Sequence, residues 1–482
     1  MSWDGFVDGL RAAVVWVMDV TSVPIIVYFV LINTSLLVLV VLAYVEFRSQ
    51  QRRRATALTW QGAGMAPGVS LLVPAYNEEA GIVTAVKSFL TLRYPRHEVV
   101  VIDDGSTDAT FARIEEAFDL VAVPRELPQE IPVRARTLGV YVPRDGRTRL
   151  VVVRKENSGK TEALNLGINA ASEPLVAMLD GDSILEPDGL LHVTRPFADD
   201  PTRMVATGGA IRPVNGSRVV SGRIVDVEMP RNWLARIQLV EYLRAFLLGR
   251  TGWSRLGGLI LISGAFGLFR RDVVVEVGGL EPDTIGEDFE LVMRIHKKLR
   301  DEGRDYAIEF VPEPVSWTEV PVSARILRRQ RKRWHRGLWE TLWAYRSMLF
   351  HPRYGRVGWV ALPYYWLFEL LAPLLELFGI IVVPLALLLG VINIPFAVLF
   401  LVLAYGYAVL VTLAAMVVDE WAFHKHDRWR AIWQTIAASV LENVGYRQAT
   451  VVWRLEGWWA SLRGKKHVWG VMTRTGFDED AA

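Results

Sequence analysis

The segment EVVVIDDGS, residues 98–106, indicates the fold class of this chain. It begins with a run of β-branched residues, which is typical of a buried strand, and ends in two aspartates and a glycine. The segment that follows, TDATFARIEEAF at 107–118, spaces its apolar residues as an amphipathic helix does. A buried strand followed by such a helix is the repeating unit of an α/β parallel sheet.

Similar strand-like runs occur elsewhere in the chain, at 69–76, 149–156 and 174–183. We therefore predict a Rossmann-like α/β domain with a mixed, mostly parallel sheet. Each run ends in polar residues, and ligands bind at the carboxyl ends of the strands in such sheets. We expect these polar residues to meet at one edge: Tyr76, Asn77, Glu78, Asp103, Asp104, Lys160, Asp180 and Asp182.

Lys160 lies in NSGKT, which ends like a nucleotide-binding P-loop. A P-loop also needs a glycine five residues before the glycine of the Gly-Lys pair, and Arg154 occupies that position. The sequence therefore argues against a P-loop. Lys160 still lies at a predicted helix start, where backbone N–H groups favour an anion, although a solvated surface lysine is the alternative.

Three further motifs carry candidate chemistry. Asp180 and Asp182 in LDGDS can share one hard divalent cation, Mg²⁺ or Mn²⁺, that bridges to a diphosphate. Glu287 and Asp288 begin a predicted helix, either as a general base or simply as carboxylates that the helix dipole stabilises. In RRQRKRWHRG, an amide, a guanidinium and an indole share one helix face and suit a diphosphate and a sugar ring: Gln330, Arg333 and Trp334.

The composition indicates a membrane protein, since 51% of the residues are hydrophobic. We expect transmembrane helices at 23–47, 362–390 and 395–418. Arginines follow the first span, which places the N-terminus outside and residue 48 in the cytoplasm. The chain has no Cys, which excludes disulfides and Cys-ligated metal sites, and its net charge of +2 gives no argument for nucleic acid as a partner.

These segments define the expected domains. Residues 1–22 are extracytoplasmic and residues 55–320 form the cytosolic domain. Residues 321–360 carry the basic motif and interfacial helices, residues 361–418 hold two or three membrane helices, and residues 419–482 are cytosolic or interfacial. Within 431–453 we expect an amphipathic helix at the membrane surface, with a core helix of the cytosolic domain as the alternative. Four tryptophans would lie at headgroup level: Trp433, Trp453, Trp458 and Trp459.

Together the motifs VPAYNEE, VIDDGSTD, LDGDS, GED and QRKRW resemble those of the family-2 processive glycosyltransferases, which include cellulose, hyaluronan, chitin and poly-N-acetylglucosamine synthases. The resemblance covers roughly residues 60–350 and the flanking membrane segments. It implies a GT-A fold and an inverting hexosyltransferase in the inner, cytoplasmic membrane. The implied partners are a UDP-sugar donor, a growing polysaccharide acceptor and the lipid bilayer.

The same resemblance assigns roles to individual residues. Tyr76 and Glu78 would hold the nucleobase, and Asp103 or Asp104 the uracil or ribose. Lys160 would approach the diphosphate, Asp180 and Asp182 would hold the metal and UDP, and Asp288 would be the catalytic base. The acceptor would meet Ser263, Gly264 and Trp334, while Gln330 and Arg333 hold the diphosphate.

Two alternatives stay open from the sequence. A non-processive enzyme could glycosylate a membrane lipid, although QRKRW argues against it. Three spans are also few for a polymer channel, so either residues 362–453 contain a further span, or a homo-oligomer or an accessory export subunit completes the channel. A non-catalytic receptor is disfavoured because the acidic residues are all intact.

Overall fold

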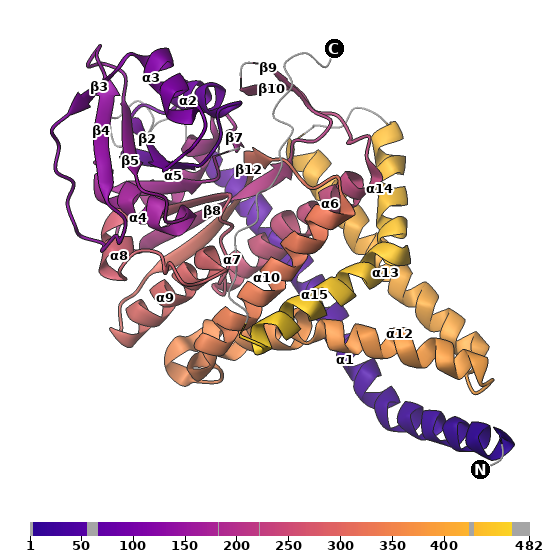
Figure 1. The fold of residues 1–482 in the computed structure, drawn as a ribbon. Helices are drawn as coiled ribbons and strands as arrows, with labels where there is room; N and C mark the ends of the chain where they lie inside the picture. Colours follow the sequence, from indigo (N-terminus) through magenta and orange to yellow (C-terminus); the bar gives the residue numbers. More distant parts are fainter. Residues whose placement is uncertain (1–2, 55–65, 182, 221, 424–428, 465–482) are drawn as a thin grey trace.

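The computed structural model describes residues 3–54, 66–181, 183–220, 222–423 and 429–464 (Figure 1). The strands are β1 (Val69–Ala75), β2 (His97–Asp104), β3 (Leu120–Val123), β4 (Thr137–Pro143), β5 (Leu150–Lys155), β6 (Leu175–Leu179), β7 (Ile184–Leu185), β8 (Met204–Pro213), β9 (Arg218–Val220), β10 (Arg223–Asp226), β11 (Phe266–Arg270) and β12 (Ala307–Thr318). The helices of the same domain are α2 (Ile82–Leu90), α3 (Thr110–Phe118), α4 (Lys160–Ala170), α5 (Gly189–Asp199), α6 (Trp233–Tyr242), η3 (Leu243–Arg250), α7 (Thr251–Leu256), α8 (Arg271–Glu276) and α9 (Glu287–Asp301).

The remaining described helices surround this domain or project from it. They are α1 (Trp3–Arg54), α10 (Ala324–Ala344), η4 (Arg346–Met348), η5 (Pro352–Tyr354), η6 (Val357–Ala361), α11 (Leu362–Tyr364), η7 (Tyr365–Leu370), α12 (Ala372–Leu388), α13 (Ile394–Phe423), α14 (Trp429–Leu441), η8 (Glu442–Tyr446) and α15 (Arg447–Leu462).

Ten strands form one mixed sheet in the order β3-β4-β5-β2-β1-β6-β11-β8-β12-β7. The central strands β5, β2, β1 and β6 run parallel, so their carboxyl ends meet at one edge. The four strands predicted from the sequence are these central strands, shifted by no more than a few residues. The expected α/β architecture is confirmed, and the antiparallel strands that flank the centre make the sheet mixed.

Two hydrophobic cores cover the two faces of the sheet. Successive residues of β1 alternate between them: Leu71 and Val73 pack with residues of α2, whereas Leu72 packs with residues of α4. This alternation is the two-residue period of a strand. Because both faces are buried, the central strands are continuously apolar, which explains why their sequences read as β-branched runs.

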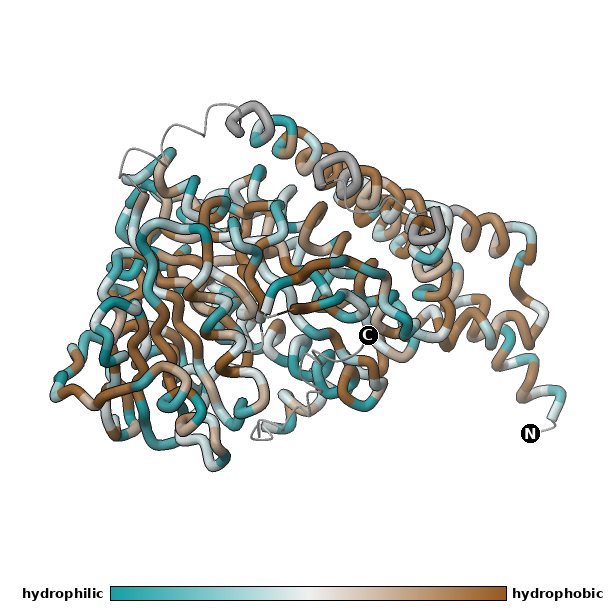
Figure 2. The backbone as a smooth tube through the Cα atoms, turned by 90° about the horizontal axis from the view of Figure 1, so that it is seen from above, coloured by the Kyte–Doolittle hydropathy of each residue, from teal (hydrophilic) through white to brown (hydrophobic). Residues whose placement is uncertain are grey.

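Two helical segments are long and apolar enough to cross a membrane by length and composition: Trp3–Gln50 and Val357–Leu388. The first is one continuous helix, α1, which also includes most of the stretch expected to precede the span. The third expected span, 395–418, lies within α13. Figures 1 and 2 show α1, α12 and α13 extending away from the sheet as predominantly hydrophobic helices.

The C-terminal region differs from the single amphipathic helix expected at 431–453. The chain breaks between α14 and α15, where Val444 is non-helical and Gly445 has φ 83°. A positive φ suits glycine because it has no Cβ atom. Trp433 is 68% and Trp459 56% exposed, whereas Trp458 is only partly exposed because α15 lies against α10.

Ion pairs and a glycine fix α15 on α10. Glu456 accepts from Arg328 at 3.0 Å and lies 3.2 Å from Lys332 Nζ, so two residues of the basic run bind a helix of the same chain. A Cβ atom on Gly457 would lie 2.4 Å from the Lys332 carbonyl oxygen. The two helices therefore approach closely at this point.

A second glycine contact joins α10 to the start of α9. A Cβ atom on Gly337 would lie 3.2 Å from both the N and Cα atoms of Gly286. The two backbones are therefore in direct contact, which brings the QRKRW helix beside Glu287 and Asp288.

Candidate active site

One continuous cavity of about 3790 Å³ runs from the carboxyl edge of the sheet to the apolar helices. It is lined by the loops after β1, β2 and β6, by the start of α9, by α10, and then by η3, α12, α15 and α1. Twelve of the residues proposed from the sequence line it: Tyr76, Glu78, Asp104, Lys160, Asp180, Ser263, Gly264, Glu287, Asp288, Gln330, Arg333 and Trp334. Asp103 does not line it, and Asp182 lies outside the described residues.

The loop after β1 is fixed by hydrogen bonds to the loop after β2. Asn77 adopts φ 55°, and its Oδ1 atom accepts from the Thr107 backbone N–H at 2.8 Å. The Thr110 hydroxyl lies 2.8 Å from the Glu78 backbone nitrogen, which donates to it. These bonds leave the Tyr76 side chain 46% exposed at the cavity.

Asp104 holds together the loop that precedes Lys160. Its Oδ1 atom accepts from the Ser158 N–H at 3.0 Å and its Oδ2 atom from the Gly159 N–H at 2.8 Å. Lys155 Nζ also donates to Asp104 Oδ1, and the lysine is fully buried. Asp104 therefore has its carboxylate committed to the protein, although it borders the cavity.

Lys155 is a residue that the sequence reasoning missed. Parallel pairing of β2 with β5 places it directly beside Asp104 in the register. The signal was the lysine at the end of an apolar strand, but it becomes meaningful only once the neighbouring strand is known. Asp103, the other aspartate of the motif, is buried and accepts from the Ser106 N–H at 3.1 Å and from Arg154 Nε at 3.4 Å.

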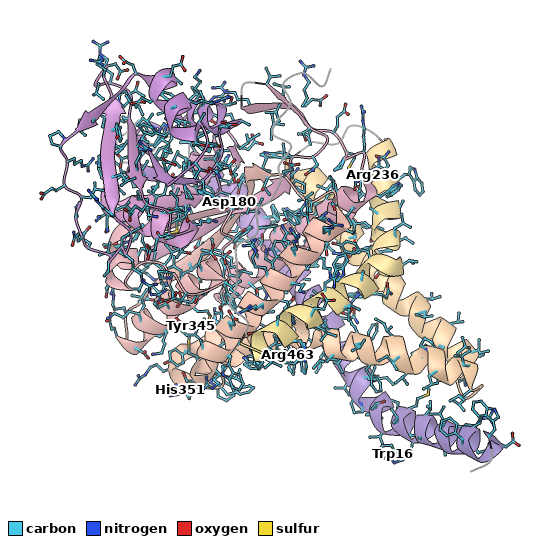
Figure 3. All side chains as sticks on the ribbon, viewed as in Figure 1. Trp16, Asp180, Arg236, Tyr345, His351 and Arg463 are labelled. Atoms are coloured by element: carbon cyan, nitrogen blue, oxygen red, sulfur yellow. The ribbon has the colours of Figure 1, made fainter. Side chains whose placement is uncertain are left out.

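Lys160 joins the strand ends to the start of α9. Its Nζ atom lies 2.5 Å from Asp180 Oδ1 and 3.8 Å from Glu287 Oε1. Burial by itself lowers the pKa of Lys160, but the carboxylates of Asp180, Glu287 and Asp288 outweigh it and raise that pKa above its usual value. The lysine therefore stays charged at neutral pH. Figure 3 shows Asp180 on the side of the sheet that faces the helices.

Two adjacent acids at the start of α9 have different surroundings. Glu287 is buried, and burial together with Asp288 raises its pKa although Lys160 lowers it. Asp288 is more accessible: its Oδ2 atom accepts from the Gly264 N–H at 2.7 Å and its Oδ1 atom from the Phe289 N–H at 2.8 Å. These bonds fix the Asp288 carboxylate in the cavity, beside the loop formed by Ser263, Gly264 and Ala265.

Helix α10 delivers the remaining proposed residues to the cavity. The Oε1 atom of Gln330 is buried and has no hydrogen-bond partner among the described residues. The Trp334 side chain is 42% exposed, and the Arg331 guanidinium lies 4.7 Å from the centre of its ring. Arg331 in turn pairs with Glu241 at 2.5 Å, which holds the guanidinium in place against the Trp334 ring.

The helical end of the cavity is lined by interhelical ion pairs. Glu376 of α12 accepts from Arg447 of α15 at 3.0 and 3.1 Å. Glu369 lies 3.8 Å from Arg454, and Arg244 of η3 pairs with Glu442. Glu369 and Glu376, which lie within the expected span 362–390, are thus partnered, and they border the cavity.

Asp180 has the chemistry of a ligand for a hard cation. It is a partly exposed carboxylate, and its Oδ2 atom makes no hydrogen bond to a described residue. Among the described residues no group of three or more His, Cys, Asp or Glu could hold a metal ion. The donor set fits a cation that takes a minority of its ligands from protein and the rest from substrate and water.

Comparison with family models gives two matches. The model of glycosyl transferase family 2 matches residues 70–277. The model of glycosyl transferase family group 2 matches residues 175–417, which is half of the chain.

Two curated relatives are poly-beta-1,6-N-acetyl-D-glucosamine synthases. The protein of Staphylococcus aureus (strain COL) is 30% identical over 277 residues, covering 57% of this chain and 55% of the relative. The protein of Staphylococcus epidermidis is 29% identical over 275 residues, with the same coverage. The matched region thus spans about half the length of these relatives.

A solved structure shares the fold. The mannosyltransferase PcManGT from Pyrobaculum calidifontis, in complex with GDP-Man and Mn²⁺, superposes with a TM-score of 0.51 at 17% identity. The match covers 90% of this chain and 99% of that one. The GT-A fold expected from the sequence is thereby confirmed.

Proposed function

Because this chain belongs to glycosyl transferase family group 2, we propose that it is an inverting, processive hexosyltransferase of the cytoplasmic membrane. It would take sugar from a UDP-linked donor and add it to a β-linked polysaccharide that leaves the cell. N-acetylglucosamine is the first sugar to propose, since the staphylococcal relatives are named for a polymer of it.

One observation carries the proposal: a single cavity is lined by all the described donor, base and acceptor candidates except Asp103, and it continues between the apolar helices. A soluble sugar nucleotide can enter at the carboxyl edge of the sheet, where such folds bind ligands. A polar polymer can leave along the ion-paired helical end.

The donor would lie along the strand ends. Tyr76 and Glu78 border the space for the nucleobase, with Asp103 and Asp104 behind it. Lys160, Gln330 and Arg333 would meet the diphosphate with a cation and hydrogen-bond donors. Asp180 and Asp182 would hold Mg²⁺ or Mn²⁺, which when bound offsets the charge of the departing diphosphate.

Asp288 would act as the general base. Its carboxylate takes the proton of an acceptor hydroxyl as that oxygen bonds to the anomeric carbon of the donor. The bond from this carbon to the diphosphate oxygen breaks, and UDP leaves with the electron pair. Attack from the opposite face inverts the anomeric centre. Ser263 and Gly264 border the acceptor, and Trp334 offers the aromatic face on which a sugar ring stacks.

Coupling to export follows from the same cavity. Residues of α1 and α12, which belong to the two candidate spans, line its far end. Each added sugar would push the chain one unit towards these helices. A second copy of this chain or an accessory subunit would complete the passage if these helices alone do not enclose it.

The test is a donor screen with the purified full chain in detergent or nanodiscs. We expect UDP release from UDP-N-acetylglucosamine with Mg²⁺ or Mn²⁺, together with product of high mass that a β-hexosaminidase degrades. A product of one or two sugars on a lipid would instead establish the lipid-glycosylating alternative. No UDP release from any common sugar nucleotide, by protein that binds UDP, would sink the proposal.

A further inference from the structure

Arg250, the last residue of η3, lines the cavity without an acidic partner among the described residues. Its guanidinium lies 3.9 Å from the centre of the Phe246 ring, and its Nη1 atom is buried with no hydrogen-bond partner. Two other arginines of this cavity do pair with acids: Arg244 with Glu442, and Arg331 with Glu241. A buried N–H without an acceptor is costly, so this group points to a ligand.

Arg250 belongs to the acceptor side of the cavity. Phe289, the residue after Asp288, packs on Tyr365 with ring centroids 6.3 Å apart. Tyr365 also packs on Trp253, three residues after Arg250, at 6.0 Å. The Asp288 carboxylate interacts electrostatically with Arg250. A sugar whose hydroxyl reaches Asp288 therefore has Arg250 as a neighbour.

The charges around this place select a neutral ligand. Asp288 interacts with Arg250, and Asp180 and Glu287 line the same cavity, so a sugar that carries a carboxylate would be repelled. A guanidinium stays protonated and offers its N–H edge to an oxygen acceptor, while Phe246 covers one of its faces. Among neutral sugar substituents, the amide carbonyl of an acetamido group is a strong acceptor, since an amide oxygen has two lone pairs and no competing O–H.

We propose that Arg250 donates a hydrogen bond to the acetamido carbonyl of the acceptor sugar beside Asp288, and so selects N-acetylated acceptors. The inference rests on the proposed function and refines it. It assigns to one residue a preference that none of the five sequence motifs contains. Arg250 acts here as a specificity-determining residue and takes no part in proton transfer.

The experiment compares two neutral acceptors at saturating UDP-N-acetylglucosamine. One is a short β-1,6-linked N-acetylglucosamine oligomer, and the other is the matching glucose oligomer, which has a hydroxyl in place of the acetamido group. For the wild type we expect a lower KM for the acetylated acceptor. In Arg250→Gln this KM should rise about tenfold, as loss of a charged hydrogen bond implies, while the KM of the glucose oligomer stays unchanged.

Two further variants guard the interpretation. Arg255→Gln is the matched control, because Arg255 lies on α7 five residues away, is 45% exposed and does not line the cavity. It should keep both KM values. Arg250→Lys keeps a cation over Phe246, and replaces the Gln variant if that protein fails to bind UDP. We expect it to retain part of the acetyl preference.

The outcomes separate the two proposals. An acetyl preference that persists unchanged in both Arg250 variants overturns the role of Arg250 and leaves the transferase intact. The same holds if wild-type protein extends the glucose oligomer as readily as the acetylated one. Absence of UDP release from every sugar nucleotide by wild-type protein defeats the proposed function itself.

Discussion

The two ends of the cavity are built in different ways. At the sheet end, loops that follow parallel strands bring Tyr76, Asp104 and Asp180 together, and the buried pair of Asp104 with Lys155 fixes them. At the helical end, separate helices are joined by ion pairs such as Glu376–Arg447, whose side chains are 25% and 51% exposed. The ion pair that supports the first end is buried, whereas the Glu376–Arg447 pair at the second end is partly exposed.

The two kinds of support suit different tasks. Exact placement of a diphosphate and a proton acceptor benefits from buried, fully hydrogen-bonded supports. The proposed passage for a moving polymer would benefit from polar groups that satisfy each other and so bind no sugar tightly.

The largest effect is expected at the boundary between the two ends. Asp288→Asn removes the proposed base, so kcat for UDP release should fall by about 10²–10⁴-fold, with UDP affinity unchanged by calorimetry. Asp283→Asn, an exposed aspartate five residues earlier, should keep full activity. Turnover that survives in Asp288→Asn would remove Asp288 from the reaction.

The stability of the sheet end should depend on its buried ion pair, Lys155–Asp104. Lys155→Met leaves the Asp104 carboxylate without its buried cation, so the free energy of unfolding should fall by about 3–5 kcal/mol. Thermal unfolding in detergent measures it, with Lys87→Met on the exposed face of α2 as control. Equal melting temperatures for the two variants would show that the pair does not stabilise this end.

His335 tests the helical end through pH. Burial, aided by Arg454, lowers its pKa to about 3 from the ordinary value of 6.5. The folded state therefore keeps a neutral imidazole, whereas the unfolded state takes up a proton as the pH falls below 6.5. The contribution of His335 to the free energy of unfolding is therefore complete above pH 6.5 and is lost as the pH falls. From His335 alone, the free energy of unfolding should drop by about 1.5 kcal/mol between pH 6.5 and 5. In His335→Gln the melting temperature should vary less over this range, and an identical pH profile would contradict the assignment.

Lys160 tests whether the strand-end cation serves the donor. Lys160→Ala removes one charge from a diphosphate site that a metal also neutralises, so kcat/KM for the donor should fall about tenfold. The KM for the acceptor should not change. ATPase activity should be the same in the wild type and in the variant. A change confined to the acceptor KM would move Lys160 out of the donor site.

The smallest effect is expected for a pair at the helical end. Glu376→Gln should lower the free energy of unfolding by less than about 1 kcal/mol, because its partner Arg447 is half exposed. UDP release with short acceptors should be unchanged. If this substitution stopped UDP release, the helical end would be as critical for the reaction as the sheet end. That result would contradict the proposed difference between the two ends.

The sheet end was largely predictable because its signals are local. Each strand and the polar residues after it are adjacent in sequence, so VIDDGS and LDGDS reveal both at once. Lys155 was missed because it pairs with a residue 51 positions away, and only the strand register brings them together.

The helical end was much less predictable. Arg244 and Glu442 are 198 positions apart, and Arg454 and Glu369 are 85 apart, so no spacing rule reveals these pairs. The break at Gly445 was also missed, because an amphipathic pattern continues across it. Apolar stretches long enough for a membrane span were visible from composition, since that property needs no partner.

The contact between Gly286 and Gly337 has a wider consequence. No side chain lies between the two backbones at this point, so a side chain on Gly337 would force them apart. The pair therefore sets how closely helix α10 approaches the start of α9, where Asp288, the proposed base, lies. Substitutions elsewhere on α10 that keep this contact should therefore leave the separation between α10 and the start of α9 unchanged.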